Sequence, residues 1–208
     1  MNEANTLAIA EPTVFIVDDD EAVRDALAAL VEVARLSVRT FVNGLEFLHR
    51  CSPEQPGCVV ADLRMPFMDG LELQEEMSRR GFVLPIIIIT AHGDVSSAVT
   101  AFRSGVVDFL EKPFDEGVFL RRIHEALQRD AHQRRDRSAA ASALAKLALL
   151  SPRERGVAEL MVEGCANKTI AIRLGISVRT VETHRANILN KLDIRTIPEL
   201  MRLWMHTQ

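Results

Sequence analysis

Residues 58–66 read C-V-V-A-D-L-R-M-P, a four-residue apolar run that ends in an acid and leads into a loop containing proline. Runs that are apolar throughout are typical of parallel strands buried on both faces. Alternating with helical patterns, such runs predict an α/β fold, a doubly wound five-stranded parallel sheet over residues 12–130. The other apolar runs are residues 14–17, 38–41, 85–90 and 106–110, and the helical patterns are residues 21–34, 44–51, 70–80, 95–104 and 116–129.

The chain changes in character after residue 130. Residues 129–143 are polar and alanine-rich with no apolar stripe, which fits either a continued helix or a semi-flexible linker. We expect the last helix of the first domain to continue and fray into a linker over residues 131–146. Only helical patterns follow, so residues 147–208 are predicted to form a small all-α domain.

Charge is divided between the two regions. Residues 11–130 hold 12 Lys and Arg against 21 Asp and Glu, a net charge of −9, whereas residues 131–208 hold 13 against 7, a net charge of +6. An acidic body followed by a basic segment predicts two domains with different partners.

Composition argues against several classes of protein. The longest apolar runs fall well short of the roughly 18 residues of a membrane-spanning helix, so we expect no membrane partner. The first residues lack the basic region and long apolar core of a secretory signal. Three cysteines without a C-x-x-C motif argue against a disulfide framework or a thiolate metal site, and favour the reducing cytoplasm.

Acids, a hydroxyl and a lysine follow the carboxyl ends of the predicted strands, the edge where functional groups collect in an open parallel sheet. Three aspartates at residues 18–20 follow the first strand, Asp62 the third, Thr90 the fourth and Lys112 the fifth. Crowded carboxylates repel one another unless a cation lies among them, and oxygen ligands suit Mg²⁺. A carboxylate beside a metal and an ammonium is equipped to attack phosphorus, and the pattern predicts phosphoryl transfer.

Each of these elements also has an ordinary explanation. The acids at residues 18–20 could cap the following helix, where negative charge favours the dipole. Asp62 could be a turn residue and Lys112 a solvated loop residue. Only their combination at the correct strand ends is specific.

At these residues the chain resembles the flavodoxin-like receiver domain of two-component response regulators, over about residues 12–130. The matching segments are V-D-D-D, V-V-A-D-L-R-M-P-F-M-D-G, I-I-I-I-T-A and F-L-E-K-P-F, and H-G-D-V after residue 91 resembles the FixJ subgroup. The resemblance implies that Asp62 accepts a phosphoryl group from a sensor histidine kinase and that Lys112 contacts this group.

The resemblance also implies a metal site and a switch. Mg²⁺ would be held by Asp18, Asp19, Asp62 and the backbone carbonyl of Arg64. Thr90 and Phe109 would form the switch pair, the hydroxyl moving toward the phosphoryl group while the ring turns inward; a buried phenylalanine is the alternative for Phe109. We read Asp20, the third acid of the run, as a helix cap.

The basic region begins with strong signals for a helix start. Ser151 is a predicted N-cap, with Pro152 at the first position and Glu154 at the third. Gly164 can end this helix, and we expect Asn167 to cap the next.

A helix-turn-helix motif follows. The second helix is predicted at residues 168–174, and Gly175 opens a tight turn in which Ser177 caps a third helix at residues 178–192. Two short helices joined by a turn containing glycine are typical of helix-turn-helix motifs, whose second helix enters the major groove of DNA.

The helix at residues 178–192 has two distinct faces. Its apolar face must pack on the domain and consists of Val178, Val181, Ile188, Leu189 and Leu192. The opposite face carries groups small enough to approach base edges, namely Arg179, Thr180, Thr183, Asn187 and Asn190, with Ala186 at its edge. Flanking groups that could contact phosphates are Lys168, His184, Lys191 and Arg195. Arg185 falls on the apolar side, where it could extend to the backbone or pair within the domain.

Residues 147–207 resemble the LuxR/GerE-type DNA-binding domain through L-S-P-R-E-R, N-K-T-I-A-I-R-L-G-I-S and T-V-E-T-H-R-A-N-I-L-N-K-L. In that family the last helix, here near residues 198–204, commonly supports dimerisation. Trp204 is either an anchor there or a core residue.

Together the two halves predict a cytoplasmic response regulator of the FixJ/NarL type. Its expected partners are a sensor histidine kinase, double-stranded promoter DNA, a second copy of the chain on phosphorylation, and RNA polymerase. Two alternatives remain open at this point. One is a Mg²⁺-dependent phosphotransfer or phosphatase enzyme with Asp62 as nucleophile. The other is a DNA-binding regulator that does not depend on phosphorylation.

Overall fold

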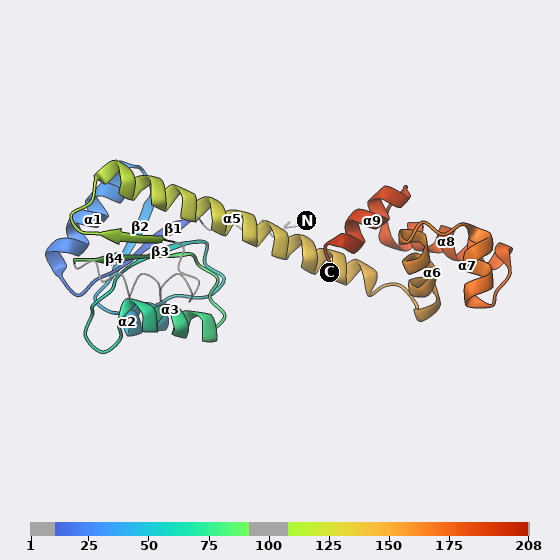
Figure 1. Cartoon of the computed structure of the whole chain (residues 1–208), viewed down its shortest axis with the longest axis horizontal. Helices are drawn as coiled ribbons and strands as arrows, with labels where there is room; N and C mark the ends of the chain where they lie inside the picture. The colour runs from blue at the N-terminus through green and yellow to red at the C-terminus, as the bar shows by residue number, and fades with distance from the viewer. Residues whose placement is uncertain (1–10, 92–107, 208) are drawn as a thin grey trace, which may run out of the picture. The chain divides into compact units, whose positions relative to one another are not determined.

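The computed structural model describes residues 11–91 and 108–207. The chain divides into two compact units, Met1–Gln133 and Arg134–Gln208, which are described separately (Figure 1). Within the described ranges, no helix combines the length and the apolar character that a bilayer crossing requires. The three cysteines are all free.

The first unit is built on a five-stranded parallel sheet, as predicted. Its strand order is β2-β1-β3-β4-β5, and every neighbouring pair is parallel. The strands are β1 (Thr13–Val17), β2 (Ser37–Phe41), β3 (Gly57–Asp62), β4 (Ile86–Thr90) and β5 (Asp108–Glu111). The helix expected at residues 95–104 and the start of the strand expected at 106–110 lie outside the described residues.

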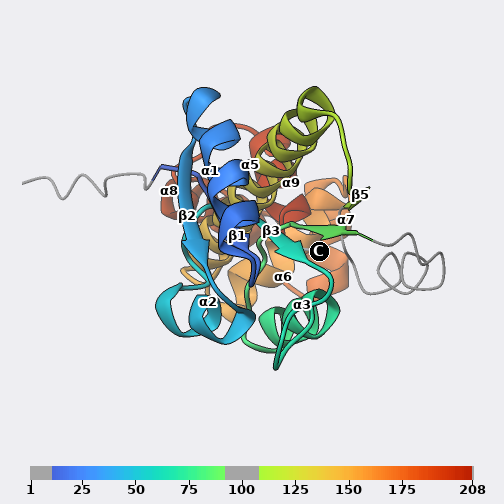
Figure 2. The same ribbon diagram turned by 90° about the vertical axis from the view of Figure 1, so that its left-hand side faces the viewer.

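Helices cover both faces of the sheet (Figures 1 and 2). Successive residues of a strand point to opposite faces, so Phe15 and Val17 pack on one side while Val14 and Ile16 pack on the other. The helices are α1 (Glu21–Val33), α2 (Gly44–Arg50), α3 (Gly70–Arg79) and the long α5 (Glu116–Leu147). Because α2 and α3 contribute to one apolar layer and α1 and α5 to the other, the sheet is buried on both faces.

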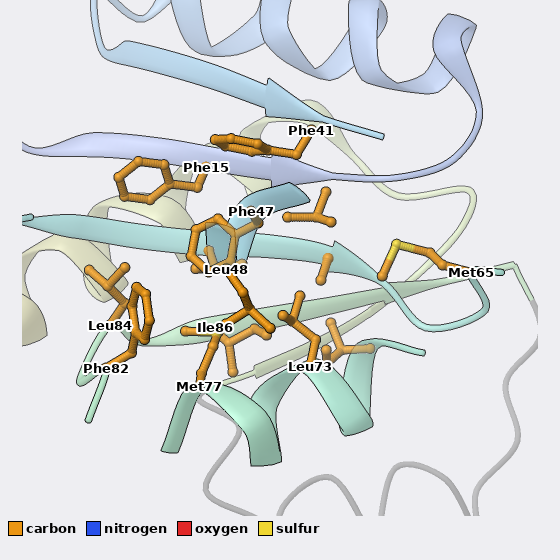
Figure 3. Close-up of a cluster of buried hydrophobic side chains, with 14 of the residues drawn as sticks. Phe15, Phe41, Phe47, Leu48, Met65, Leu73, Met77, Phe82, Leu84 and Ile86 are labelled. Atoms are coloured by element: carbon orange, nitrogen blue, oxygen red, sulfur yellow. The ribbon is translucent and has the colours of Figure 1, made fainter. Parts of the chain in front are cut away.

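Aromatic rings form the centre of the layer beneath α2 and α3 (Figure 3). Phe47 is fully buried, and its ring centroid lies 5.6 Å from that of Phe15, 5.5 Å from that of Phe41 and 5.6 Å from that of Phe82. The pairs with Phe15 and Phe41 are edge-to-face, an arrangement that adds stability beyond simple burial. Phe47 therefore joins α2 to β1 and β2.

The helix α5 is longer than the sequence indicated. We expected it to fray from residue 131, but it is continuous to Leu147. Anchors on both sides explain the difference. Ile123 packs in the core of the first unit and Leu147 in that of the second, while the buried Asp130 accepts a hydrogen bond from the Gly57 amide at 2.9 Å. Residues 131–142 have no buried side chain, and their alanines and arginines favour a helix between the anchored ends.

The second unit contains four shorter helices, α6 (Pro152–Val162), α7 (Asn167–Leu174), α8 (Val178–Leu192) and α9 (Ile197–Met205). The predicted caps Ser151 and Ser177 are confirmed, the first within a reciprocal capping box with Glu154. Gly164 and Gly175 follow the ends of α6 and α7 with positive φ, as helix-ending glycines do.

Two predictions for these helices were wrong. Asn167 is the first residue of α7, and the capping position is Ala166, which makes no side-chain cap. Val178 is 41% exposed and stands outside the core, because as the first residue of α8 it precedes the turn that packs. Val181, Ile188 and Leu192 of the predicted apolar face are buried as expected, and Leu189 is half-buried.

We predict that replacing Phe47 by alanine will lower the free energy of unfolding of the first unit by about 3–5 kcal/mol, the usual cost of removing a buried aromatic side chain. Urea denaturation followed by circular dichroism measures the change. Leu45→Ala in the same helix is the control, because Leu45 is 50% exposed; equal losses in the two variants would contradict this account of the core.

Candidate functional site

Two aspartates and one lysine meet at the carboxyl edge of the sheet. The Lys112 ammonium lies 2.9 Å from Asp62 Oδ1 and 3.2 Å from Asp18 Oδ2. Asp18 follows β1, Asp62 ends β3 and Lys112 follows β5, so parallel strands bring together residues that are 94 and 50 positions from the lysine. The structure thus brings together Asp18, Asp62 and Lys112, three of the residues selected from the sequence; we call them the carboxylate–lysine cluster.

Backbone groups fix the orientation of both carboxylates. Asp18 Oδ1 accepts a hydrogen bond from the Asp20 amide at 2.9 Å, and Asp62 Oδ2 accepts one from the Arg64 amide at 2.8 Å. The backbone amide of Lys112 donates to the Thr90 carbonyl at 2.7 Å. Each carboxylate therefore keeps one oxygen for a backbone amide and turns the other toward the ammonium.

Arg24 supports this edge and was missed by the sequence reasoning. Its guanidinium donates to the backbone carbonyls of Asp18 and Asp19 at 2.8 and 3.0 Å. The available signal was its position one turn into the helix that follows the acidic run. From there an arginine can reach back over the loop and hold its carbonyls in place.

Burial and charge act in opposite directions on the cluster. Burial raises the pKa of Asp18, although the Asp20 amide and Lys112 both act to lower it. For Lys112, burial acts to lower the pKa, but the hydrogen bond with Asp62 and the charges of both aspartates outweigh it and raise the pKa. The lysine therefore remains protonated at neutral pH.

The donors at this edge fit a magnesium ion. They are carboxylate oxygens, the hard ligands that Mg²⁺ prefers, and one ammonium does not neutralise two carboxylates. Within residues 11–91 and 108–207, no group of three or more His, Cys, Asp or Glu side chains is placed to enclose a metal. Mg²⁺ needs no such enclosure, because it keeps several waters and uses one or two carboxylates.

The other predicted site residues lie beside the cluster. Asp20 caps α1, accepting hydrogen bonds from the Ala22 and Val23 amides, which confirms its predicted role. Asp19 is exposed on the same loop. The backbone amide of Arg64 donates a hydrogen bond to Asp62. That Asp19 and the Arg64 carbonyl are metal ligands stays a prediction.

Thr90 and Phe109 occupy neighbouring strands. Thr90 is buried at the end of β4, and Phe109 in β5 is half-buried against the apolar layer beneath α2 and α3. Residues 88 and 109 are paired in the sheet, so Thr90 lies two positions beyond the partner of Phe109. Their role as a switch pair stays a prediction.

The second unit presents the predicted polar face of α8 to solvent. Arg179, Thr183, Ala186, Asn187 and Asn190 are exposed, and Thr180 and Arg185 are half-buried. Local bonds hold part of this face: the Thr183 hydroxyl donates to the Arg179 carbonyl at 3.0 Å, and the hydroxyls of Ser177 and Thr180 are 2.8 Å apart. Lys168 and Arg195 are exposed beside it. His184 is half-buried, with an enclosed Nδ1 that has no hydrogen-bond partner among the described residues.

Lys191, the remaining residue of the predicted phosphate contacts, is exposed and forms an ion pair within the domain. Its ammonium lies 2.7 Å from a carboxylate oxygen of Glu154, which is only 4% exposed. The same oxygen accepts hydrogen bonds from the amide and the hydroxyl of Ser151, each at 2.8 Å. The hydrogen bond from Lys191, reinforced by those from Ser151, lowers the pKa of Glu154 to about 2. The sequence identified Glu154 as a capping residue but not this pair, which joins α6 to α8.

The arrangement of the first unit, a parallel sheet with paired acids and a lysine at its carboxyl edge, is that of a receiver domain. Comparison with known proteins agrees. The response regulator receiver domain model matches residues 14–124, and the model of the bacterial regulatory proteins of the luxR family matches residues 148–204.

Relatives match over nearly the whole chain. The transcriptional regulatory protein FixJ of Azorhizobium caulinodans is 45% identical over 91% of this chain and 90% of its own length. The transcriptional regulatory protein TdiR of Thauera aromatica is 40% identical over 93% and 85%. Among solved structures, the response regulator StyR has a TM-score of 0.83 at 42% identity, over 94% of this chain and 99% of its own. Full-length FixJ from B. japonicum has a TM-score of 0.58 at 39% identity, over 95% and 98%.

The chain belongs to the family of two-component response regulators that join a receiver domain to a LuxR-type DNA-binding domain. It is a transcriptional regulator of the FixJ type.

We predict that Glu154→Gln will lower the free energy of unfolding at pH 7 by about 1–3 kcal/mol, because the variant leaves Lys191 without its anionic partner. The folded pKa of about 2 lies below the ordinary value of 4.5. The carboxylate therefore contributes fully above pH 4.5, and its contribution is lost as the pH falls from 4.5 toward 2. Thermal unfolding of the full chain at several pH values measures both effects.

The matched control is Glu159→Gln, which alters an exposed glutamate of the same helix. We expect this variant to unfold as the unmodified protein does. If Glu154→Gln left both the stability and its dependence on acid unaltered, the pair would have no structural role.

Proposed function

We propose that Asp62 accepts a phosphoryl group from the phosphohistidine of a sensor histidine kinase, and that this modification promotes dimerisation and promoter binding. The observation that carries the proposal is the contact of 2.9 Å between Asp62 Oδ1 and the Lys112 ammonium, at an edge where Asp18 supplies a second carboxylate. An ionised carboxylate beside a fixed positive charge has what attack on phosphorus requires.

In the transfer step, a carboxylate oxygen of Asp62 bonds to phosphorus while the phosphorus–nitrogen bond of the donor histidine breaks. Lys112 stays close enough to the acceptor carboxylate to bind an oxygen of the incoming group. The Arg64 amide and the neighbouring loop hold the carboxylate in position. Mg²⁺, held by Asp18, Asp19, Asp62 and the Arg64 carbonyl, would supply the further positive charge that offsets the phosphoryl oxygens.

A groove beside the cluster offers the kinase a place to dock. It has a volume of about 430 Å³ and is lined mainly by apolar residues of α1, including Val23, Leu27 and Leu30, and by Lys112 and Phe114 on the segment between β5 and α5. A helix of the donor that lies in this groove would be next to Lys112. This position supports a histidine kinase as the protein partner.

The second unit supports binding to double-stranded promoter DNA, and we infer that the protein acts in the cytoplasm. The polar face of α8 is exposed, and its N-terminus follows the sharp turn at Gly175, as in recognition helices. The helix α9 exposes Met201 and Met205, one turn apart, while Trp204 packs against the domain core. This apolar stripe favours a dimer through α9, and RNA polymerase is the further partner that a transcriptional activator would need.

The principal rival is an enzyme that turns over phosphate esters at Asp62. Such an enzyme needs a general acid close to its nucleophile, and the position two residues after Asp62 is Arg64. We therefore propose that the phosphorylated carboxylate is a regulatory state of the protein and not an intermediate of a turnover cycle.

We predict that Asp62→Asn will take no phosphoryl group from acetyl phosphate in the presence of Mg²⁺, whereas the unmodified chain will take one, and that removing Mg²⁺ with EDTA will prevent this. Intact-mass spectrometry measures the product. Asp69→Asn is the control in the same loop, because asparagine caps a helix about as well as aspartate and Asp69 caps α3. A label on Asp62→Asn would show that another residue is the acceptor, and multiple turnover of the phosphodonor would favour the enzyme.

We predict that Asn187→Ala will reduce the discrimination between the preferred DNA duplex and a mutated duplex by about 1–3 kcal/mol, because it removes a base-reading amide. Lys168→Ala should weaken binding to all duplexes alike and reduce the salt dependence by about one ion. Fluorescence anisotropy with a duplex selected from a random library, with and without acetyl phosphate, measures these effects.

Lys191→Gln serves as the contrasting variant, because Lys191 is bound to Glu154. It should lower stability, with little change in the salt dependence of binding. The phosphodonor could leave the DNA affinity of both the unmodified chain and Asp62→Ala unchanged. That result would favour a regulator that does not depend on phosphorylation.

A further inference from the structure

Phe67 has an unusual backbone conformation and an unusual exposure. Its φ angle is +70°, and its side chain is 89% exposed, more than any other large apolar residue in the part of the chain that the structure describes. The left-handed region is unfavourable for residues with a Cβ, and asparagine or glycine is the usual choice there. A phenylalanine at this position therefore lowers the stability of the fold in two ways, through the strained backbone and through the apolar ring exposed to water.

The loop that carries Phe67 is held at both ends. The Gly70 amide donates to the Leu63 carbonyl at 3.0 Å and the Met68 amide to the Pro66 carbonyl at 2.9 Å. Leu63 is buried in the core, and the residue after Met68 begins the capping box of α3. These contacts fix the turn, so Phe67 cannot relax without breaking them. Outliers that the surrounding structure enforces are concentrated at functional sites.

Two further exposed apolar residues come from the neighbouring loop. Val42 and Leu45, which are 46% and 50% exposed, lie between the end of β2 and the first turn of α2. The two loops touch, because a Cβ on Gly44 would lie 3.0 Å from the Met68 sulfur. We call Val42, Leu45 and Phe67 the rim patch.

The two loops that carry the rim patch adjoin the strand ends at the phosphoacceptor. Phe67 lies five residues after Asp62, and the loop that carries Phe67 ends at Gly70. A Cβ on Gly70 would lie 2.6 Å from the backbone carbonyl oxygen of Asp62. The end of β2 is tied to the end of β1 by the hydrogen bond from the Asp18 amide to the Phe41 carbonyl at 3.2 Å. Both loops therefore stand at the carboxyl edge that holds the carboxylate–lysine cluster. They lie on the α2/α3 face of the sheet, whereas the groove at α1 lies on the opposite face.

We propose that the rim patch is a second contact surface for the protein that donates the phosphoryl group, with Phe67 as its aromatic anchor. This inference rests on the proposed function. The Asp62 side chain is only 13% exposed, so a donor histidine reaches it only if the surrounding donor surface comes close to the rim. A donor that covers the edge from the α1 groove meets Phe67 on the opposite side. The matching chemistry on the donor is an apolar pocket that borders its phosphohistidine, since aromatic residues, phenylalanine among them, are enriched in protein–protein interfaces.

Phosphotransfer from a protein donor and from a small donor separates this role from a role in chemistry. The protein donor is the autophosphorylated transmitter domain, chosen from a panel of sensor histidine kinases as the one that labels the unmodified chain fastest. The small donor is acetyl phosphate. Phe67→Asn should slow transfer from the transmitter domain at least tenfold and leave labelling by acetyl phosphate within twofold. Leu45→Gln, on the second loop, should also slow transfer from the protein donor only.

Val33→Asn is the matched control, because Val33 is 83% exposed at the end of α1, away from the carboxyl edge; both of its rates should be unchanged. Phe67→Asn should keep or raise the melting temperature, since asparagine tolerates the left-handed conformation. If Phe67→Asn left transfer from the transmitter domain unaltered, whether or not it changed the monomer–dimer equilibrium, the inference would be overturned. An equally large effect on labelling by acetyl phosphate would overturn it too. Failure of the proposed function looks different, because then no donor labels the unmodified chain at Asp62.

Discussion

Two carboxylates at the ends of neighbouring strands repel each other, and the Lys112 ammonium is the positive charge that lets Asp18 and Asp62 share one edge of the sheet. The contact constrains the whole first unit. β1, β3 and β5 must run parallel and end at one level, and the strand order must place β1 beside β3. Small shifts in register would separate the lysine from the acids. A buried Asp18 without this partner would be costly, because burial alone favours its neutral form.

The second unit contains an ion pair of a carboxylate and a lysine that has a structural role. Glu154 and Lys191 are matched one to one, and the amide and the hydroxyl of Ser151 donate to the same carboxylate oxygen. The pair leaves no net charge and joins two helices. At the sheet edge, two carboxylates face one ammonium, so a net negative charge remains where a cation can approach. The number of acids for each base thus distinguishes a structural ion pair from a site that can take a metal and a phosphoryl group.

The helix α5 shows where local reasoning fails. Residues 131–142 have no apolar stripe, and a helix without one has little reason to persist by itself. The structure continues it because each end is anchored in a core, at Ile123 in the first unit and Leu147 in the second. The same reasoning succeeded for α8, where serine at the cap, glycine in the turn and the periodicity of Val181, Ile188 and Leu192 agree. The ion pair of Lys191 with Glu154 was not predicted, because the two residues lie 37 positions apart.

The sequence by itself determined the alternation of strands and helices, the sheet class, the caps at Asp20, Ser151 and Ser177, and the residues at the strand ends, since these depend on local periodicity and hydrogen bonding. The tertiary structure decided what depends on distant neighbours. It brought Lys112 to Asp18 and Asp62, turned Lys191 toward Glu154, and joined the Asp130 carboxylate to the Gly57 amide. These contacts join residues that are 37 to 94 positions apart along the chain, and no local pattern of residues encodes such contacts.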